Sequence, residues 1–167
     1  MTVFRVARRT ALPADEAWRR ITDWPAHGRR VPLTRILVET PGPTGTGTVF
    51  VARTALGRVG FDDPMEIVRW EPPGAGSPGR CRLEKRGRVI TGWAEIEITE
   101  TETASASASA SASASASASA IDGRTLVSWA EELRISFLPR FLDRVTARTG
   151  RVVFGRVVDG LLRGQGR

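Results

Sequence analysis

At two sites, this chain of 167 residues carries side chains suited to acid–base chemistry, although neither site belongs to a recognisable catalytic motif. His27 is the only histidine, and its imidazole titrates near neutral pH, so it could act as a general base. The alternative for His27 is a solvated loop histidine without a chemical role. Asp62 and Asp63 stand together before Pro64, where paired carboxylates could exchange protons or bind a cation. Aspartates before a proline are, however, typical of turns, and we expect a turn there.

Glu131 is a further candidate, because it falls in a stretch that alternates like a β-strand. One face of this stretch is apolar at every second position, and Glu131 shares that face with Val127, Trp129, Leu133 and Ile135. If this face is the inner one, burial raises the pKa of the carboxyl group or requires a partner such as an arginine. A strand end, a bulge or a register shift would place it in water instead. Glu95 has the same Trp-Ala-Glu context, but its strand is more apolar on the other face, so we expect Glu95 outside.

Metal and cofactor sites are not expected. One histidine and one cysteine, Cys81, without clustered carboxylates do not make a zinc ligand set. Residues 42–47 lack the Gly-Lys-Ser/Thr ending of a phosphate-binding loop. The lone cysteine excludes an internal disulfide and fits a cytoplasmic location. The N-terminus has no apolar signal segment and no apolar run is long enough for a bilayer, so we expect no integral membrane association.

The chain is basic, with a formal net charge of +7 and Lys85 as its only lysine. Such a charge would suit nucleic acid or an anionic membrane surface. The arginines are spread over the whole chain, and abundant arginine and glycine without tyrosine match the coding bias of a GC-rich bacterium. We therefore expect no nucleic-acid partner and keep a basic RNA- or membrane-interacting module as a third hypothesis.

The spacing of apolar residues predicts the helices and strands that must position these side chains. A strand at residues 3–10 precedes a helix that begins at Leu12-Pro13, because proline suits a first helical turn. This helix has one apolar face and is expected to end at Pro25, with a second short helix at 26–31. Strands follow at 34–39, 47–55, 65–70, 80–86, 89–99 and 125–136, and short turns between consecutive strands favour antiparallel pairing.

A long helix over residues 138–162 closes the chain, with Pro139 in its first turn. We expect it to turn an apolar stripe inward, made of Leu138, Phe141, Leu142, Val145, Val152 and Val153. Residues 104–120 are a strict alternation of alanine and serine between the last two strands. Three explanations stay open for them: a neutral, mobile expansion of a hairpin loop, an extension of the two strands, or a functional tether. We expect a single domain over 1–167 that contains this insertion, because long surface loops cost little closure entropy.

Several short motifs resemble a known superfamily. Residues 12–18 (LPADEAW) with Thr22-Asp23-Trp24-Pro25 are similar to the opening of START-like proteins, which include the Bet v 1-like and polyketide cyclase/dehydrase (SRPBCC) proteins. Gly45-Thr46-Gly47-Thr48 resembles their glycine-containing turn, and Trp70-Glu71-Pro72-Pro73 their strand-ending proline motif. The resemblance covers the chain except the serine–alanine tract. It implies an α+β helix-grip fold, in which a curved seven-stranded antiparallel sheet surrounds a long C-terminal helix, with two small helices after the first strand.

The resemblance also implies a cavity between sheet and helix for a hydrophobic small molecule, such as a lipid or a polyketide, with His27 near its mouth. We expect a monomer or homodimer that binds such a ligand through Trp24, His27, Val51, Met65, Leu83, Trp129, Glu131 and Val153. Trp70 and Trp93 are further candidates for the lining. The alternative is a polyketide cyclase or aromatase-like enzyme with Glu131 or His27 as its acid–base group. Such cyclases combine several polar groups, and the scarcity of these groups here favours a binding protein.

Overall fold

A computed structural model describes residues 2–101, 124–136 and 143–163 of the chain. Its elements, in chain order, are β1 (Thr2–Thr10), α1 (Ala14–Ile21), α2 (Trp24–Gly28), β2 (Thr34–Val38), β3 (Val49–Leu56), β4 (Val59–Glu71), β5 (Gly79–Arg86), β6 (Ile90–Glu100), β7 (Thr125–Ile135) and α3 (Asp143–Arg163). The serine–alanine tract at 104–120 and the expected start of the last helix, with Leu138, Phe141 and Leu142, lie outside the described residues.

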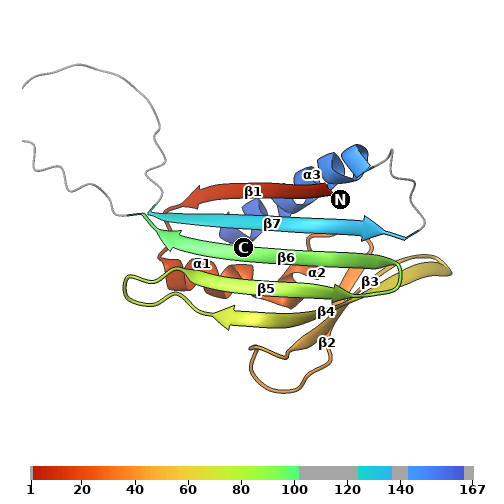
Figure 1. Ribbon diagram of the computed structural model, residues 1–167, viewed down its shortest axis with the longest axis horizontal. Helices are drawn as coiled ribbons and strands as arrows, with labels where there is room; N and C mark the ends of the chain where they lie inside the picture. Colours follow the sequence, from red (N-terminus) through yellow and green to blue (C-terminus); the bar gives the residue numbers. More distant parts are fainter. Residues whose placement is uncertain (1, 102–123, 137–142, 164–167) are drawn as a thin grey trace, which may run out of the picture.

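The strands form one seven-stranded sheet in the order β1-β7-β6-β5-β4-β3-β2, and every neighbouring pair is antiparallel (Figure 1). β1 and β2 are therefore the two edges, and the helices α1 and α2 carry the chain from one edge to the other. β6 and β7 pair from Ile90↔Ile135 to Glu100↔Thr125. The two strands that flank the serine–alanine tract are thus hydrogen-bonded to each other. The expected antiparallel sheet is confirmed.

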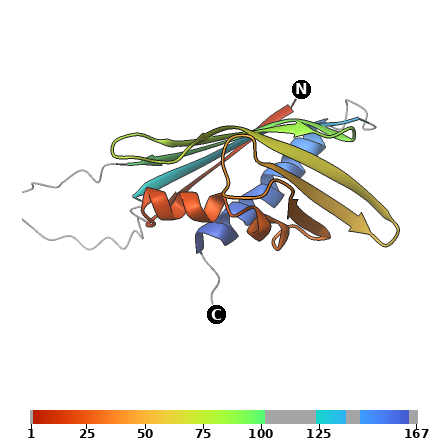
Figure 2. The ribbon, with the colours of Figure 1, turned by 90° about the horizontal axis from the view of Figure 1, so that it is seen from below.

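All three helices lie on one face of the sheet (Figure 2), and α3 contacts β1, α1 and α2. The predicted apolar face of α1 is confirmed, since Ala14, Ala17, Trp18 and Ile21 are buried. The expected end of this helix at Pro25 is wrong. α1 ends at Ile21, and Pro25 instead occupies the first turn of α2, where its missing N–H costs no hydrogen bond.

α3 does not present the predicted apolar stripe to the sheet. Val145 and Val152 are exposed, whereas the buried positions are Gly150, Gly155, Val157, Val158, Leu161 and Leu162. The reason is close packing at Gly150. A Cβ atom at this position would lie 2.7 Å from the ring of Phe4 on β1. The contact face of the helix thus combines two glycines with the apolar residues of its C-terminal half.

β4 begins six residues before the predicted strand, so the expected turn at Asp62-Asp63-Pro64 is wrong. β3 pairs with β4 through this stretch, with Val51 opposite Pro64, whereas the pairing of β4 with β5 begins only at Met65↔Lys85. Pro64 therefore lies where β4 has no neighbour on its other side, and its missing N–H removes no ladder bond. The residue before proline prefers an extended backbone, which suits a strand equally well.

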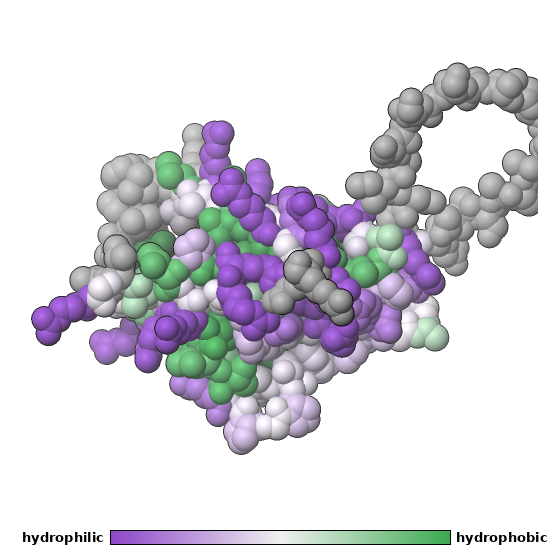
Figure 3. All heavy atoms as spheres, turned by 180° about the vertical axis from the view of Figure 1, so that it is seen from behind, coloured by the Kyte–Doolittle hydropathy of each residue, from purple (hydrophilic) through white to green (hydrophobic). Residues whose placement is uncertain are grey.

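The outer face of the sheet is polar and its charges are largely paired. Cross-strand ion pairs join Arg80 to Glu97 at 3.1 Å and Arg82 to Glu95 at 3.3 Å. Glu95 is thus outside the core, as predicted. On the opposite side of the molecule, where the helices lie, hydrophilic side chains are interspersed with hydrophobic patches (Figure 3).

Candidate ligand pocket

A cavity of about 220 Å³ lies between the sheet and the helices α2 and α3. Side chains from α2, α3 and every strand except β1 line it, as do those of the segment that joins α2 to β2. The lining consists of Trp24, His27, Val31, Thr34, Ile36, Phe50, Ala52, Thr54, Phe61, Asp63, Met65, Leu83, Lys85, Ile90, Ala94, Trp129, Glu131, Leu133 and Phe154. Most of these side chains are aromatic or aliphatic, so the pocket is an apolar space with few polar groups.

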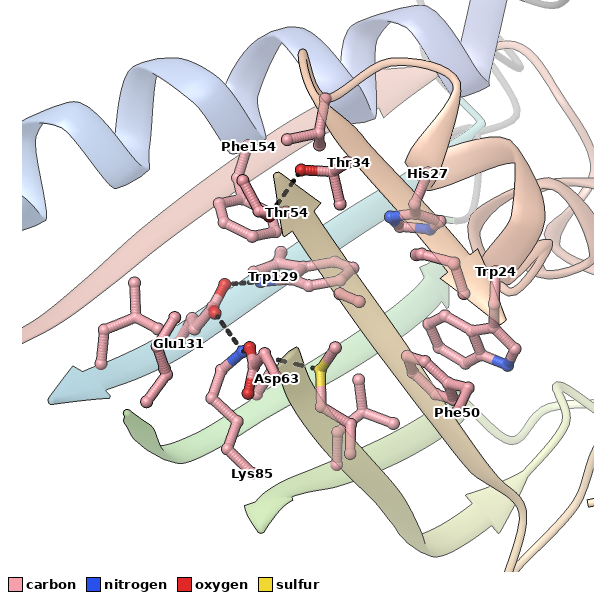
Figure 4. Close-up of a pocket in the computed structure, with 18 of the residues that line it drawn as sticks. Trp24, His27, Thr34, Phe50, Thr54, Asp63, Lys85, Trp129, Glu131 and Phe154 are labelled. Carbon is pink, nitrogen blue, oxygen red and sulfur yellow. Dashed lines mark hydrogen bonds and ion pairs between the residues drawn. The ribbon is translucent and has the colours of Figure 1, made fainter. Parts of the chain in front are cut away.

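The charged groups of the lining gather in one cluster, which we call the charged triad: Asp63, Lys85 and Glu131 (Figure 4). Lys85 Nζ donates to Asp63 Oδ2 at 2.8 Å and lies 3.2 Å from Glu131 Oε1. Glu131 Oε2 accepts a hydrogen bond of 3.0 Å from Trp129 Nε1. All three residues are buried, with exposed fractions of 5%, 8% and 1% for Asp63, Lys85 and Glu131. Charges so far from water persist only when they are paired.

Strand geometry brings the triad together. Successive side chains on a strand point to opposite faces, so Lys85 shares the inner face of β5 with Cys81 and Leu83. Asp63 shares the inner face of β4 with Met65 and Ile67, both buried. Its neighbour Asp62 points outward and pairs with Arg53 at 2.7 Å. The two adjacent carboxylates thus have separate partners and do not form a joint acid–base pair.

Sequence reasoning missed Asp63 and Lys85 as pocket residues, although the alternation of β5 contained the signal for Lys85. Cys81 and Leu83 mark the inner face, and Lys85 is the next residue on it. Glu131 follows from the same reasoning, and the structure places it on the inner face of β7, as the alternation of that strand indicates. Its partner is a lysine rather than an arginine.

The triad shifts the proton affinities of its members. Burial raises the pKa of Glu131, and the nearby Asp63 carboxylate adds to this rise, while Lys85 and the Trp129 hydrogen bond oppose it. For Lys85, burial alone would lower the pKa, but the carboxylates of Glu131 and Asp63 outweigh burial and raise it. Lys85 is therefore held as an ammonium at neutral pH, and Glu131 holds protons more tightly than an exposed glutamate.

His27 lies elsewhere in the pocket, next to aromatic rings. It is buried, so the alternative of a solvated loop histidine is wrong. Its Nε2 is 2.7 Å from the carbonyl oxygen of Ile21. Since a carbonyl only accepts, Nε2 carries the proton and Nδ1 the lone pair. Burial lowers the pKa of His27 to about 4. The ring is thus neutral near pH 7 and a weak base.

Aromatic side chains form the wall away from the triad. The rings of Trp24 and Phe50 are stacked 4.7 Å apart. His27 is 5.5 Å from Trp24 and 5.6 Å from Trp129, and Phe154 of α3 lies 5.3 Å from Trp129. A ligand in this space would meet ring faces and edges on several sides.

The structure brings six of the eight expected ligand-binding residues together in the pocket: Trp24, His27, Met65, Leu83, Trp129 and Glu131. Val51 and Val153 lie outside it. On β3 the pocket face carries Phe50 and Ala52, so the alternation turns Val51 to the opposite face.

Two tryptophans named as candidates for the lining also lie elsewhere. Trp70 packs edge-on against Trp18 at 4.8 Å, and Trp93 donates to Glu132 and stacks under Arg82.

Within residues 2–101, 124–136 and 143–163, no cluster of three or more histidine, cysteine or acidic side chains could hold a metal ion. In the same ranges, no helix combines the length and apolar character that a membrane crossing requires.

Comparison with known proteins identifies the fold. No family model and no curated protein matches the sequence. Solved structures match over nearly the whole chain. TTHA0849 from Thermus thermophilus is similar with a TM-score of 0.63 and 12% identity, over 97% of this chain and 95% of that one. Ara h 8.0201 gives 0.55 and 11%, over 98% and 99% of the two chains. A norcoclaurine synthase mutant from Thalictrum flavum, in complex with a transition-state analogue, gives 0.56 and 12%, over 97% and 92%. Together with the seven-stranded antiparallel sheet and the C-terminal helix, these matches show that the chain has a Bet v 1-like helix-grip fold.

Proposed function

We propose that this protein binds a small, largely apolar molecule in the pocket between the sheet and α3. The observation that carries the proposal is a cavity of about 220 Å³ whose lining is aromatic and aliphatic except for the charged triad and a few other polar side chains. Apolar pockets with a few placed polar groups are the usual form of small-molecule sites. The volume is below the roughly 300–1,000 Å³ of typical ligand pockets, which favours a compact molecule over a long acyl chain.

The expected affinity follows from the area that such a molecule would bury. A phenyl-sized body buries roughly 150–250 Å², which at about 25 cal/mol per Å² gives about 4–6 kcal/mol before the costs of association. After the costs of association, simple aromatic probes should bind with dissociation constants of about 1 mM or weaker. At ten times that concentration the protein gains about 1.4 kcal/mol, which corresponds to a rise of about 3–6 °C in the melting temperature.

The test is a thermal-shift and calorimetric titration with benzyl alcohol and indole, on wild type and two variants of β3. Ala52 lines the pocket, so Ala52→Trp fills part of it and should abolish binding. Ala55 is exposed, and Ala55→Trp on the same strand is the matched control that should bind like wild type. Equal binding by wild type and Ala52→Trp would show that the probes bind elsewhere and would contradict the proposal.

A second candidate function is acid–base catalysis, as in a polyketide cyclase or aromatase. One observation favours it: a buried carboxyl group of raised pKa, Glu131, lies beside an ammonium group in a ligand-sized pocket. Such groups are frequent at catalytic sites. His27 is less suited to the role, because its pKa is about 4 and its Nε2 is occupied by Ile21. If Glu131→Gln and His27→Ala both turn over a cyclisable substrate as fast as wild type does, Glu131 and His27 are not its acid–base groups and this mechanism fails.

A further inference from the structure

The charged triad has one more acidic than basic group. Lys85 supplies one ammonium, and Asp63 and Glu131 supply two carboxylates, all within the same buried cluster. The ion pairs that arginines form within the described ranges have their acidic partners outside this cluster, so none of those pairs balances it. A buried excess charge is costly unless a partner of opposite sign approaches it.

Hydrogen bonding shows which carboxylate is incomplete. Both oxygens of Glu131 already have donors, Lys85 for Oε1 and Trp129 for Oε2. Asp63 is different: Oδ2 accepts from Lys85, but Oδ1 is buried without a hydrogen-bond partner among the described residues. Asp63 lines the pocket, so a donor group of a ligand held there would lie next to this carboxylate.

A second buried polar atom without a partner in the described part of the chain, Trp24 Nε1, does not compete for this role. Figure 4 shows this nitrogen on the side of the indole that faces away from the triad. Asp63 is therefore the residue of the lining that combines uncompensated charge with a free acceptor. The faces of Trp129 and its aromatic neighbours add an environment that attracts cations.

We infer that the pocket selects a small ligand that carries a protonated amine on an aromatic or aliphatic body, with its N–H group donating to Asp63. This inference rests on the proposed function and adds the chemical class of the ligand to it. With the ammonium group of the ligand, the cluster would contain two basic groups for its two carboxylates. The apolar body of the ligand would fill the remaining space. A neutral ligand of equal size would leave the Asp63 acceptor unsatisfied.

The test compares three probes of nearly equal size at constant ionic strength and pH 7: benzylammonium, benzyl alcohol and benzoate. Calorimetry on the wild-type protein should rank benzylammonium at least about 10-fold tighter than benzyl alcohol, since a hydrogen bond between charged groups exceeds a neutral one by about that factor. Benzoate should bind more weakly than both, because it would add a third carboxylate to the pocket.

Two variants locate the effect. Asp63→Asn removes the excess charge and should reduce benzylammonium to the affinity of benzyl alcohol. Asp62→Asn is the matched control, because this adjacent carboxylate is on the outer face with Arg53 and should leave the preference intact. If Asp63→Asn does not fold, the ranking of the three probes by wild type still decides the question.

Each outcome separates the two proposals. Benzyl alcohol binding as tightly as benzylammonium would leave the proposed function standing and overturn the amine selectivity. An equal loss of preference in Asp62→Asn and Asp63→Asn would also overturn it, because general charge attraction would then explain the ranking. Failure of all three probes to bind would overturn both proposals.

Discussion

Replacing Lys85 by methionine tests how strongly the ammonium group of the charged triad stabilises the fold. The substitution keeps a side chain of similar length and removes the ammonium that lies 2.8 Å from Asp63 and 3.2 Å from Glu131. Two buried carboxylates would then face each other without a cation. Removal of one partner from a buried ion pair costs about 3–5 kcal/mol. For a domain of this size the melting temperature should fall by about 6–20 °C at pH 7.

The loss should also depend on pH, and its sign can be worked out. Burial already raises the pKa of Glu131, and loss of the neighbouring ammonium would raise it further. A carboxyl group whose pKa is higher in the folded than in the unfolded state binds more protons when folded, so it favours folding at low pH. The deficit of Lys85→Met relative to wild type should therefore be larger at pH 8 than at pH 5.

Urea unfolding of both proteins at the two pH values measures this difference. Arg86→Met is the matched control: the next residue on β5 forms ion pairs with Glu66 and Glu84 on the exposed face, where such pairs contribute about 0–1 kcal/mol. A loss in Lys85→Met no larger than that in Arg86→Met, or one that does not change with pH, would refute the electrostatic account of the triad.

Three further predictions concern other parts of the core. The pKa of His27 is about 4, below its usual value of 6.5, so the folded state loses about 3 kcal/mol of stability as pH falls from 6.5 to 4. In urea unfolding, His27→Gln should not show this loss of stability at low pH. A His27→Gln stability profile with the same pH dependence as wild type would contradict the prediction. Burial raises the pKa of Cys81 to about 12, so native protein should react with a thiol reagent only at the rate at which it unfolds, and rapid labelling without denaturant would be inconsistent with this. Gly150→Ala should lower stability by about 1–3 kcal/mol, because the added Cβ would lie 2.7 Å from Phe4; Gly155→Ala, where the nearest atom is the flexible end of an arginine at 3.1 Å, should cost less, and the reverse order would contradict the packing of α3.

The fold could be predicted from the sequence because its elements have clear periods. The apolar face of α1 and the alternation of β6 and β7 follow from local patterns, and the structure agrees with them. Glu131 emerges in the same way, since it interrupts an otherwise apolar face. Its burial could not be derived from β7 alone, because the compensating cation comes from a different strand.

The remaining features depend on pairing that a single sequence does not reveal. The sequence pattern predicts a turn at Asp63 because Pro64 follows it, and only the absence of a second neighbour for that part of β4 makes the proline acceptable in a strand. The alternation of β5 places Lys85 on the inner face, but its carboxylate partners lie on β4 and β7, and lysine is rarely buried without a partner. The contact face of α3 differs from the predicted stripe because Gly150 packs against Phe4 and the buried apolar residues lie in the C-terminal half of the helix, at Val157, Val158, Leu161 and Leu162.

The central claim is that a ligand occupies the pocket between the sheet and α3, and the five tryptophans of the chain offer a direct measurement of it. Each indole N–H gives its own signal in a ¹⁵N–¹H correlation spectrum. Trp24 and Trp129 line the pocket, whereas Trp70 and Trp93 lie outside it. Titration with benzylammonium should shift the signals of Trp24 and Trp129 and leave those of Trp70 and Trp93 in place. Unchanged signals of Trp24 and Trp129 at saturating probe, or shifts confined to Trp70 and Trp93, would contradict the claim.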